Sequence, residues 1–213
     1  MTLPAELLDD CIATGRDFHA RGWSLGTSSN YSVVSGREPL RLWITGSGFD
    51  KGRLRPEQFV EVDAAGRGLD EARPRPSAET LLHVVVAQAT GAGAVLHTHS
   101  VWGTLLSEAH LPGGQLELAG YEMLKGLAGI TTHAAAARLA VFPNTQDIPD
   151  LAARLERRLA AGDPALRHGF LLAGHGLYTW GRDLAEARRH VEVLEFLLEV
   201  TGRKNVHRPA LQP

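Results

Sequence analysis

The sequence has one cysteine, no long apolar run and almost no net charge. Cys11 has no partner for an intrachain disulfide among the 213 residues, which is typical of a reducing compartment. No stretch reaches the ~18 uninterrupted apolar residues of a membrane-spanning helix, so we expect no membrane partner. Lys plus Arg total 22 against 24 for Asp plus Glu, and no local basic patch is evident. A nucleic-acid partner is therefore not expected.

Several short motifs are also missing. The first ten residues lack the basic and apolar regions of a secretory signal, so the sequence predicts a cytoplasmic protein. Neither G-x-x-x-x-G-K-[ST] nor G-x-G-x-x-G occurs, which disfavours nucleotide binding. Without a cysteine cluster, a structural zinc finger is excluded. The whole sequence is 44% hydrophobic and 22% charged, which is the composition of a globular protein. We expect residues 1–213 to form a single domain.

Hydrophobic periodicity and turn residues predict a mixed α/β domain. We expect helices over 4–21, 77–90, 101–108, 121–127, 148–161 and 183–201, and strands over 31–35, 40–45, 59–63, 94–99, 170–173 and 177–180. Thr2 is the expected N-cap of the first helix, with Pro4 in its first turn, and Ser77 is the expected cap of the second. No repeat or low-complexity linker divides the chain.

Histidine is abundant, with ten residues, and three of them suggest a metal site. His97 and His99 end a predicted strand, where residues i and i+2 point to one face and can reach one metal ion. An H-x-H pair decides little by itself, because two histidines that only cap a strand end are the simpler interpretation. His175 lies between Gly174 and Gly176 in a turn that permits close backbone approach. Three imidazoles with an open coordination position are typical of catalytic metal sites.

Two glutamates and three small-residue turns complete the candidates. Glu79 follows Ser77 in a first helical turn, where an acid also interacts favourably with the helix dipole. Glu122 has Lys125 three residues later, the spacing of a surface ion pair. The turns at 27–30, at 47–48 and at Ser77 offer hydroxyls and backbone N–H groups that suit a phosphate monoester. Ordinary turns and helix caps use the same residue types, so both interpretations stay open.

Five motifs, in this order, resemble those of the class II aldolase and adducin-head family. They are G-T-S-S-N-Y-S at 26–32, I-T-G-S-G-F-D-K-G at 44–52, P-S-A-E at 76–79, L-H-T-H at 96–99 and G-H-G-L at 174–177. The resemblance extends from about residue 5 to residue 202, nearly the whole chain. It implies a single-domain, three-layer α/β fold with a central, mainly antiparallel sheet flanked by helices. It also implies a homotetramer with metal sites near the subunit borders.

The resemblance assigns roles to particular residues. It implies one zinc ion per subunit on His97, His99 and His175, although three histidines also accept Co²⁺ or Fe²⁺. Glu79 occupies the place of the catalytic acid/base of the aldolases. The residues that match phosphate-binding positions are Thr27, Asn30, Ser47, Gly48 and Ser77. Ala78 departs from the second serine that aldolases often have, which puts one phosphate hydrogen bond in question.

Two segments resemble one branch of the family, whose members dehydrate 5-methylthioribulose 1-phosphate in methionine salvage. They are G-Y-E-M-L-K-G at 120–126, which aldolases and epimerases lack, and H-G-L-Y-T-W-G at 175–181. This branch implies a zinc-dependent hydro-lyase acting on a sugar phosphate, and we predict Glu122 as its general acid/base. The alternatives are an aldolase or epimerase of fuculose or ribulose phosphate and a non-catalytic scaffold like the adducin head.

Overall fold

One continuous eight-stranded sheet forms the centre of the protein. A computed structural model describes residues 5–207. Its strands are β1 (Asn30–Arg37), β2 (Leu40–Thr45), β3 (Phe59–Asp63), β4 (Ala94–Thr98), β5 (Gln115–Ala119), β6 (Ala136–Phe142), β7 (Gly169–Leu172) and β8 (Gly176–Gly181). They lie in the order β3-β2-β1-β4-β8-β7-β6-β5. Every neighbouring pair is antiparallel except β6 with β7, so the mainly antiparallel sheet predicted for this α/β fold is confirmed.

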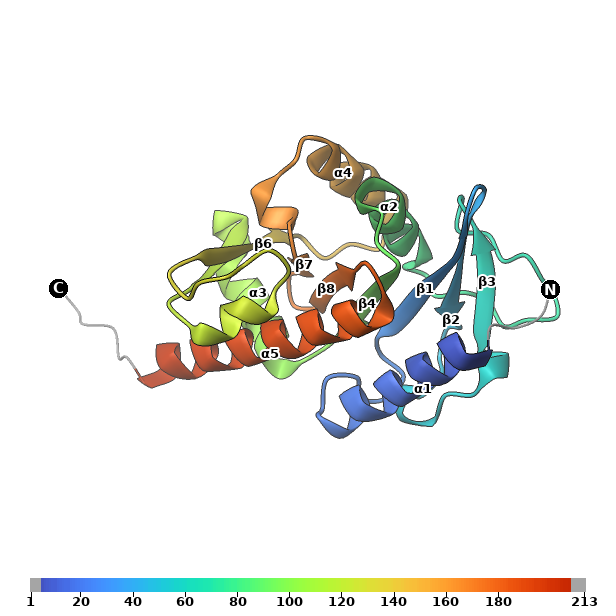
Figure 1. The fold of residues 1–213 in the computed structure, drawn as a ribbon, viewed down its shortest axis with the longest axis horizontal. Helices are drawn as coiled ribbons and strands as arrows, with labels where there is room; N and C mark the ends of the chain where they lie inside the picture. The colour runs from blue at the N-terminus through green and yellow to red at the C-terminus, as the bar shows by residue number, and fades with distance from the viewer. Residues whose placement is uncertain (1–4, 208–213) are drawn as a thin grey trace.

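Helices cover both faces of this sheet, which gives the three expected layers (Figure 1). They are α1 (Ala5–Ala20), α2 (Thr80–Thr90), α3 (Val101–His110), α4 (Ile148–Ala160) and α5 (Leu184–His207), with short 3-10 helices η1 (Lys51–Arg53), η2 (Pro56–Gln58), η3 (Leu111–Gly113), η4 (Glu122–Gly126) and η5 (Pro164–Leu166). α2 and α4 pack on one face, while α1 and α5 pack on the other, where α3 lies against α5.

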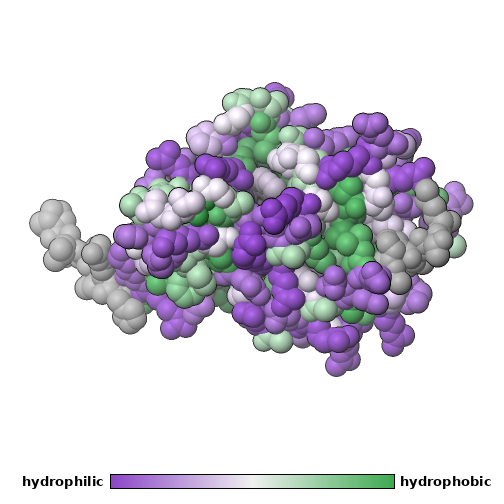
Figure 2. Space-filling model, viewed as in Figure 1, coloured by the Kyte–Doolittle hydropathy of each residue, from purple (hydrophilic) through white to green (hydrophobic). Residues whose placement is uncertain are grey.

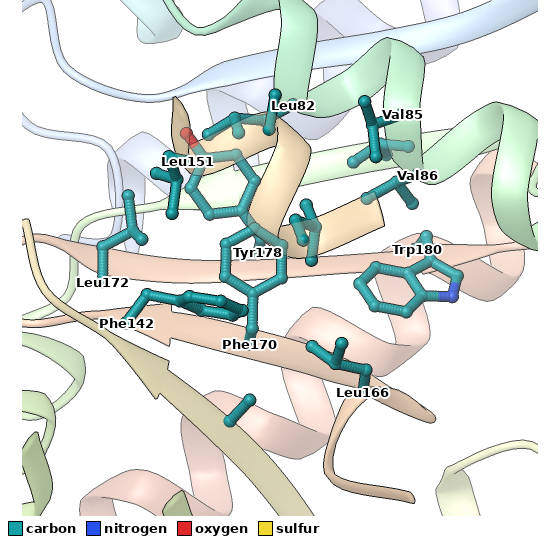
Figure 3. Packing of buried hydrophobic residues seen from close by; sticks show 14 of the residues in the cluster. Leu82, Val85, Val86, Phe142, Leu151, Leu166, Phe170, Leu172, Tyr178 and Trp180 are labelled. Carbon is teal, nitrogen blue, oxygen red and sulfur yellow. The ribbon is translucent and has the colours of Figure 1, made fainter. Parts of the chain in front are cut away.

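Aromatic side chains form the core beneath α2 and α4. Tyr178 of β8 stacks on Phe170 of β7, with ring centroids 4.6 Å apart and planes 5° from parallel (Figure 3). Leu82 of α2 and Leu151 of α4 close over these rings, and all four side chains are fully buried. Each such burial stabilises the fold by about 1.5–3 kcal/mol. Strands β7 and β8, which lie next to the candidate site, are therefore anchored rigidly.

Two of the strands, β5 and β6, were not predicted from the sequence. β5 alternates exposed and buried residues over five residues, the same length as β3, so its alternation was a sufficient signal that the prediction did not use. β6 begins within the alanine run at 134–137, a composition that favours helix in isolation. Pairing with β5 on one side and β7 on the other makes this segment a strand, because tertiary contacts override local propensity.

Two of the predicted helices also differ from the structure. α2 begins at Thr80 with Glu79 as its N-cap residue, so the prediction that Ser77 caps this helix is wrong. The Ser77 carbonyl instead accepts from the Thr80 amide, and its hydroxyl accepts from the Glu79 amide at 3.3 Å. The segment predicted as a helix over 121–127 forms only the short η4. Thr2 and Pro4, predicted to start the first helix, lie outside the described residues.

No helix within residues 5–207 has the length and apolar character needed to cross a bilayer. The face shown in Figure 2 carries hydrophilic side chains over most of its area, with smaller hydrophobic patches between them.

Candidate active site and metal centre

Three histidines meet where the central strands β4 and β8 lie end to start, in the middle of the sheet. His97 lies in β4, His99 directly follows that strand, and His175 stands in the turn between β7 and β8. The Nε2 atom of His97 lies 2.8 Å from that of His99 and 3.2 Å from that of His175. Because β4 pairs with β8, the end of one and the start of the other coincide. Residues far apart in sequence thus converge, as the sequence predicted.

The protonation of the rings suits a metal ion. His97 donates from Nδ1 to the Leu177 carbonyl at 2.9 Å, and His175 donates from Nδ1 to Asn144 Oδ1 at 3.2 Å. A neutral imidazole protonated at Nδ1 has its lone pair on Nε2, so both lone pairs face the same point. The 3.2 Å separation is close to the ~3.3 Å expected between nitrogens around tetrahedral zinc, and the 2.8 Å separation is shorter. The donor set therefore fits a divalent metal ion.

Burial keeps the rings of His97 and His99 neutral. It holds the pKa of His97 well below its usual range, and the neighbouring imidazoles of His99 and His175 lower it further. Burial, with His175 and Lys51 nearby, lowers the pKa of His99 to about 4. Neutral imidazoles keep the lone pairs that metal coordination requires.

A row of side chains across the sheet holds His97 in place. Asn30, His97, Tyr178 and Phe170 are consecutive cross-strand partners on β1, β4, β8 and β7. The His97 ring stacks on Tyr178 with centroids 3.9 Å apart and planes 13° from parallel. Tyr178 in turn rests on Phe170, as Figure 3 shows. The hydrophobic core therefore determines the orientation of this imidazole.

Gly176 permits the close approach of the two strands. A Cβ atom at this position would lie 2.0 Å from the Thr98 carbonyl oxygen and 3.1 Å from Cε1 of His97. No side chain fits in that space, so a glycine is required. The tight backbone approach expected around His175 is confirmed at this residue.

Glu79 points at the histidine cluster. Its Oε1 lies 3.2 Å from Nε2 of His175, and its Oε2 lies 3.6 Å from Nε2 of His97. The same Oε2 accepts from Nδ2 of Asn30 at 2.7 Å. Among the described residues that line the cavity, Glu79 is thus the carboxylate that lies beside the histidine cluster.

A buried relay orients Asn30. Its Oδ1 accepts from Nε2 of His83, and Nδ1 of His83 accepts from the Ser32 hydroxyl at 2.8 Å. Burial lowers the pKa of His83 to about 3, so the ring is neutral and these donor and acceptor roles are consistent. Asn30, predicted to bind phosphate, therefore uses its amide to hold Glu79.

A cavity of about 440 Å³ opens beside the cluster. Its lining includes all five residues predicted to bind phosphate together with Glu79, His99 and His175: Thr27, Asn30, Ser47, Gly48 and Ser77. Thr145 and Gln146, from the segment before α4, also line it. His97, which is fully buried, lies behind the cavity rather than in its wall. A small phosphorylated ligand would reach the histidines and the three turns at once.

Glu122 lies outside this cavity. It belongs to η4, its side chain is 70% exposed, and it does not line the cavity. It forms the expected ion pair with Lys125, and its Oε2 lies 3.5 Å from Nδ1 of His133. The hydrogen bond from Lys125 lowers the pKa of this carboxyl. Within one chain, the structure does not bring Glu122 to the histidine cluster.

Sequence reasoning missed Tyr178, His83 and Lys51. Strand alternation could have placed Tyr178, because it shares a face of β8 with Trp180 and is the cross-strand partner of His97. No local pattern distinguishes His83, which lies among the apolar residues of α2. Lys51, which lines the cavity, gave no signal, since lysines are usually solvated.

Comparison with known proteins agrees with this site. The class II aldolase and adducin N-terminal domain family matches residues 9–201. The chain belongs to this family. Class II aldolases are typically zinc-dependent, and the histidine cluster is a possible metal site of this member.

Members of the class II aldolase family resemble the chain in sequence and in fold. The methylthioribulose-1-phosphate dehydratase of Methylococcus capsulatus is 49% identical over 195 residues, which cover 91% of this chain and 92% of that protein. The dehydratase of Sorangium cellulosum is 44% identical over 191 residues, covering 89% and 88%. The crystal structure of L-fuculose-1-phosphate aldolase from Thermus thermophilus superposes with a TM-score of 0.74 at 25% identity, covering 95% of this chain and 96% of that one.

Proposed function

We propose that this chain dehydrates 5-methylthio-D-ribulose 1-phosphate to 2,3-diketo-5-methylthiopentyl 1-phosphate, a step of methionine salvage. The observation that carries the proposal is 49% identity to a methylthioribulose-1-phosphate dehydratase across 91% of the chain. The arrangement of the histidine cluster, Glu79 and the hydroxyl-lined cavity supports it.

His97, His99 and His175 would hold one zinc ion per subunit. When bound, zinc supplies Lewis-acid stabilisation for the negative charge that develops as C3 loses its proton. The Leu177 carbonyl and Asn144 orient two of the ligand rings. Such outer hydrogen bonds set the tautomer that a metal ligand needs.

The phosphate would bind at the three turns. Thr27, Ser47 and Ser77 present hydroxyls to the cavity, and Gly48, at φ 81°, leaves its backbone open with no neighbour around a Cβ position. With the phosphate on C1 held there, C3 and C4 lie toward Glu79 and the histidines. Holding the reacting atoms in this way lowers the entropic part of the barrier.

The reaction needs one proton removed and one delivered. A carboxylate takes the C3 proton, the C–H electron pair forms the C3–C4 double bond, and the C4–O bond breaks. The hydroxyl leaves as water after receiving a proton, and the enol tautomerises to the diketone. Glu122 is our candidate for these transfers, with Glu79 beside the C3 oxygen as its partner.

The position of Glu122 has a consequence for assembly. Because it is exposed and outside the cavity of its own chain, it can act only at the cavity of another copy. We therefore propose that η4 of one subunit closes the site of its neighbour, within the homotetramer that the family resemblance implies.

Product analysis tests the activity. Zinc-loaded protein incubated with 5-methylthioribulose 1-phosphate should convert the C3 and C4 carbinol NMR signals to those of a 2,3-diketone, and a chelator should abolish the change. Untouched substrate, in protein with measured zinc, would contradict the proposal. The likeness to an L-fuculose-1-phosphate aldolase makes aldol cleavage or epimerisation the second candidate. With fuculose or ribulose phosphate, that candidate predicts a short aldehyde or a C4 epimer.

A further inference from the structure

The cavity assigned to the phosphate contains one unexpected cation. Lys51, the first residue of η1, has a side chain that is 1% exposed. Among the described residues that line the cavity, it is the only lysine or arginine, and Glu79 is the only carboxylate. A phosphate monoester carries about −1.5 to −2 charge at pH 7. Without Lys51, neutral donors alone would have to hold this dianion beside a negative glutamate.

The ammonium lies between two of the predicted phosphate turns. Its Nζ donates to the carbonyl of Thr27 at 3.2 Å and to that of Phe49 at 2.6 Å. Thr27 belongs to the first turn, and Phe49 directly follows Ser47 and Gly48 of the second. An ammonium has three N–H donors, so these carbonyls leave one donor for a ligand in the cavity.

No carboxylate of the described residues forms an ion pair with Lys51. The neighbouring Asp50 instead accepts from the Gly52 amide at 2.8 Å and lies 3.5 Å from Nδ1 of His19. Burial lowers the pKa of Lys51 to about 8, against the smaller opposing effect of Asp50. The group is still mostly protonated at pH 7. A buried ammonium without an adjacent anion is unfavourable, and an anionic ligand would compensate for it.

We propose that Lys51 binds the phosphate of the substrate and that its charge makes the cavity selective for dianions. This inference rests on the proposed function for the identity of the substrate, but it makes a claim about the anion that can be measured without turnover. The alternative is that Lys51 only ties the two turns together through their carbonyls.

Two small anions of the same shape separate these roles. Methyl phosphate is largely a dianion at pH 7.5, whereas methyl sulfate is a monoanion. We would measure the dissociation constants of both by titration calorimetry with the zinc-loaded protein and with Lys51→Met, which keeps the chain length and removes the charge. Lys51→Gln is the second variant, in case the first does not fold. Arg203→Met, which removes an equally positive but exposed side chain on α5, is the matched control.

We expect Lys51→Met to weaken methyl phosphate binding by about 10- to 100-fold and methyl sulfate binding much less, because a hydrogen bond to a doubly charged acceptor is lost. Arg203→Met should leave both constants unchanged. If the binding of both anions weakened equally, Lys51 would only tie the two turns together, and the proposal would be overturned. Unchanged binding of both anions would overturn it as well. Failure of the wild-type protein to dehydrate its substrate would contradict the proposed function and leave this result intact.

Discussion

Two groups of histidines lie at opposite ends of β7 and β8, and one of the two resembles a metal centre. At one end, the Nε2 atoms of His97, His99 and His175 converge. At the other, His168 donates from Nε2 to the Ala128 carbonyl at 2.8 Å. His190 donates to the Trp180 carbonyl and accepts from the Ala128 amide at 3.0 Å.

Burial and protonation do not distinguish these groups. Burial lowers the pKa of His168 and His190, as it lowers the pKa of His97 and His99. The difference lies in where the ring nitrogens point. The second pair uses them on backbone groups, which stabilises the packing of α5 and the segment before β7. The first group brings its Nε2 atoms together, and a metal ion between them would use their lone pairs.

The largest effect should come from removing a converging histidine. His97→Ala should lose zinc and lower activity by about 10³-fold or more, because Lewis-acid stabilisation supplies several kcal/mol. Metal analysis and turnover measure both losses. His190→Gln is the matched control, since it should keep its zinc although it loses backbone hydrogen bonds. A His97→Ala protein that stays zinc-loaded would remove the distinction between the two groups.

The carboxylates should come next. Glu122→Gln should lower kcat by about 10²–10⁴-fold if Glu122 is the general acid/base. A decrease of less than about threefold would exclude that role and leave Glu79 as the stronger candidate.

Mixed oligomers sharpen this test. Neither His97→Ala nor Glu122→Gln subunits should be active alone. Refolded together, they should recover part of the activity, because some sites then combine an intact cluster with an intact Glu122 from a neighbour. No recovery in oligomers shown to be mixed would mean that Glu122 does not act across a subunit border.

A smaller effect is expected from the outer hydrogen bond of His175. Asn144→Ala removes the acceptor that selects its Nδ1 tautomer and should weaken zinc binding by about 10–100-fold. Competition with a chelator of known affinity measures the change. Zinc affinity equal to that of the wild type would show that the ring is oriented by other contacts.

The smallest effect concerns pH and the second histidine pair. Since burial lowers the folded-state pKa of His168, the unfolded chain binds a proton near pH 6.5 that the folded chain does not. Its contribution to stability is complete above that pH and is lost as the pH falls toward the lowered folded-state pKa. In metal-free protein, His168→Gln should therefore reduce the dependence of unfolding free energy on pH below 6.5, by at most about 1.4 kcal/mol per pH unit. Denaturant unfolding at pH 7.5, 6.0 and 5.0 measures it, and an unchanged slope would contradict the assignment.

Local sequence patterns predicted most of the fold and part of the site. Strong periodicity located α5, and alternation located β3 with the bounds that the structure has. The spacing of His97 and His99 placed two imidazoles on one face, and the glycines around His175 predicted the close strand approach. β6 was not predicted, because its alanine-rich start favours helix and only pairing with β5 and β7 makes it a strand. Glu122 could not be positioned, because the spacing to Lys125 describes only its own turn.

The sequence by itself therefore determined which residues can carry the chemistry: three histidines, two glutamates and hydroxyl-bearing turns, in an order that resembles one family. The tertiary structure decided which of these groups face one another. Strand pairing makes His97 a neighbour of Asn30 and Tyr178. Burial beside the two turns places the ammonium of Lys51 at the cavity, whereas most lysines are solvated. Which residues become neighbours across a sheet depends on its strand order, and no local pattern encodes that order.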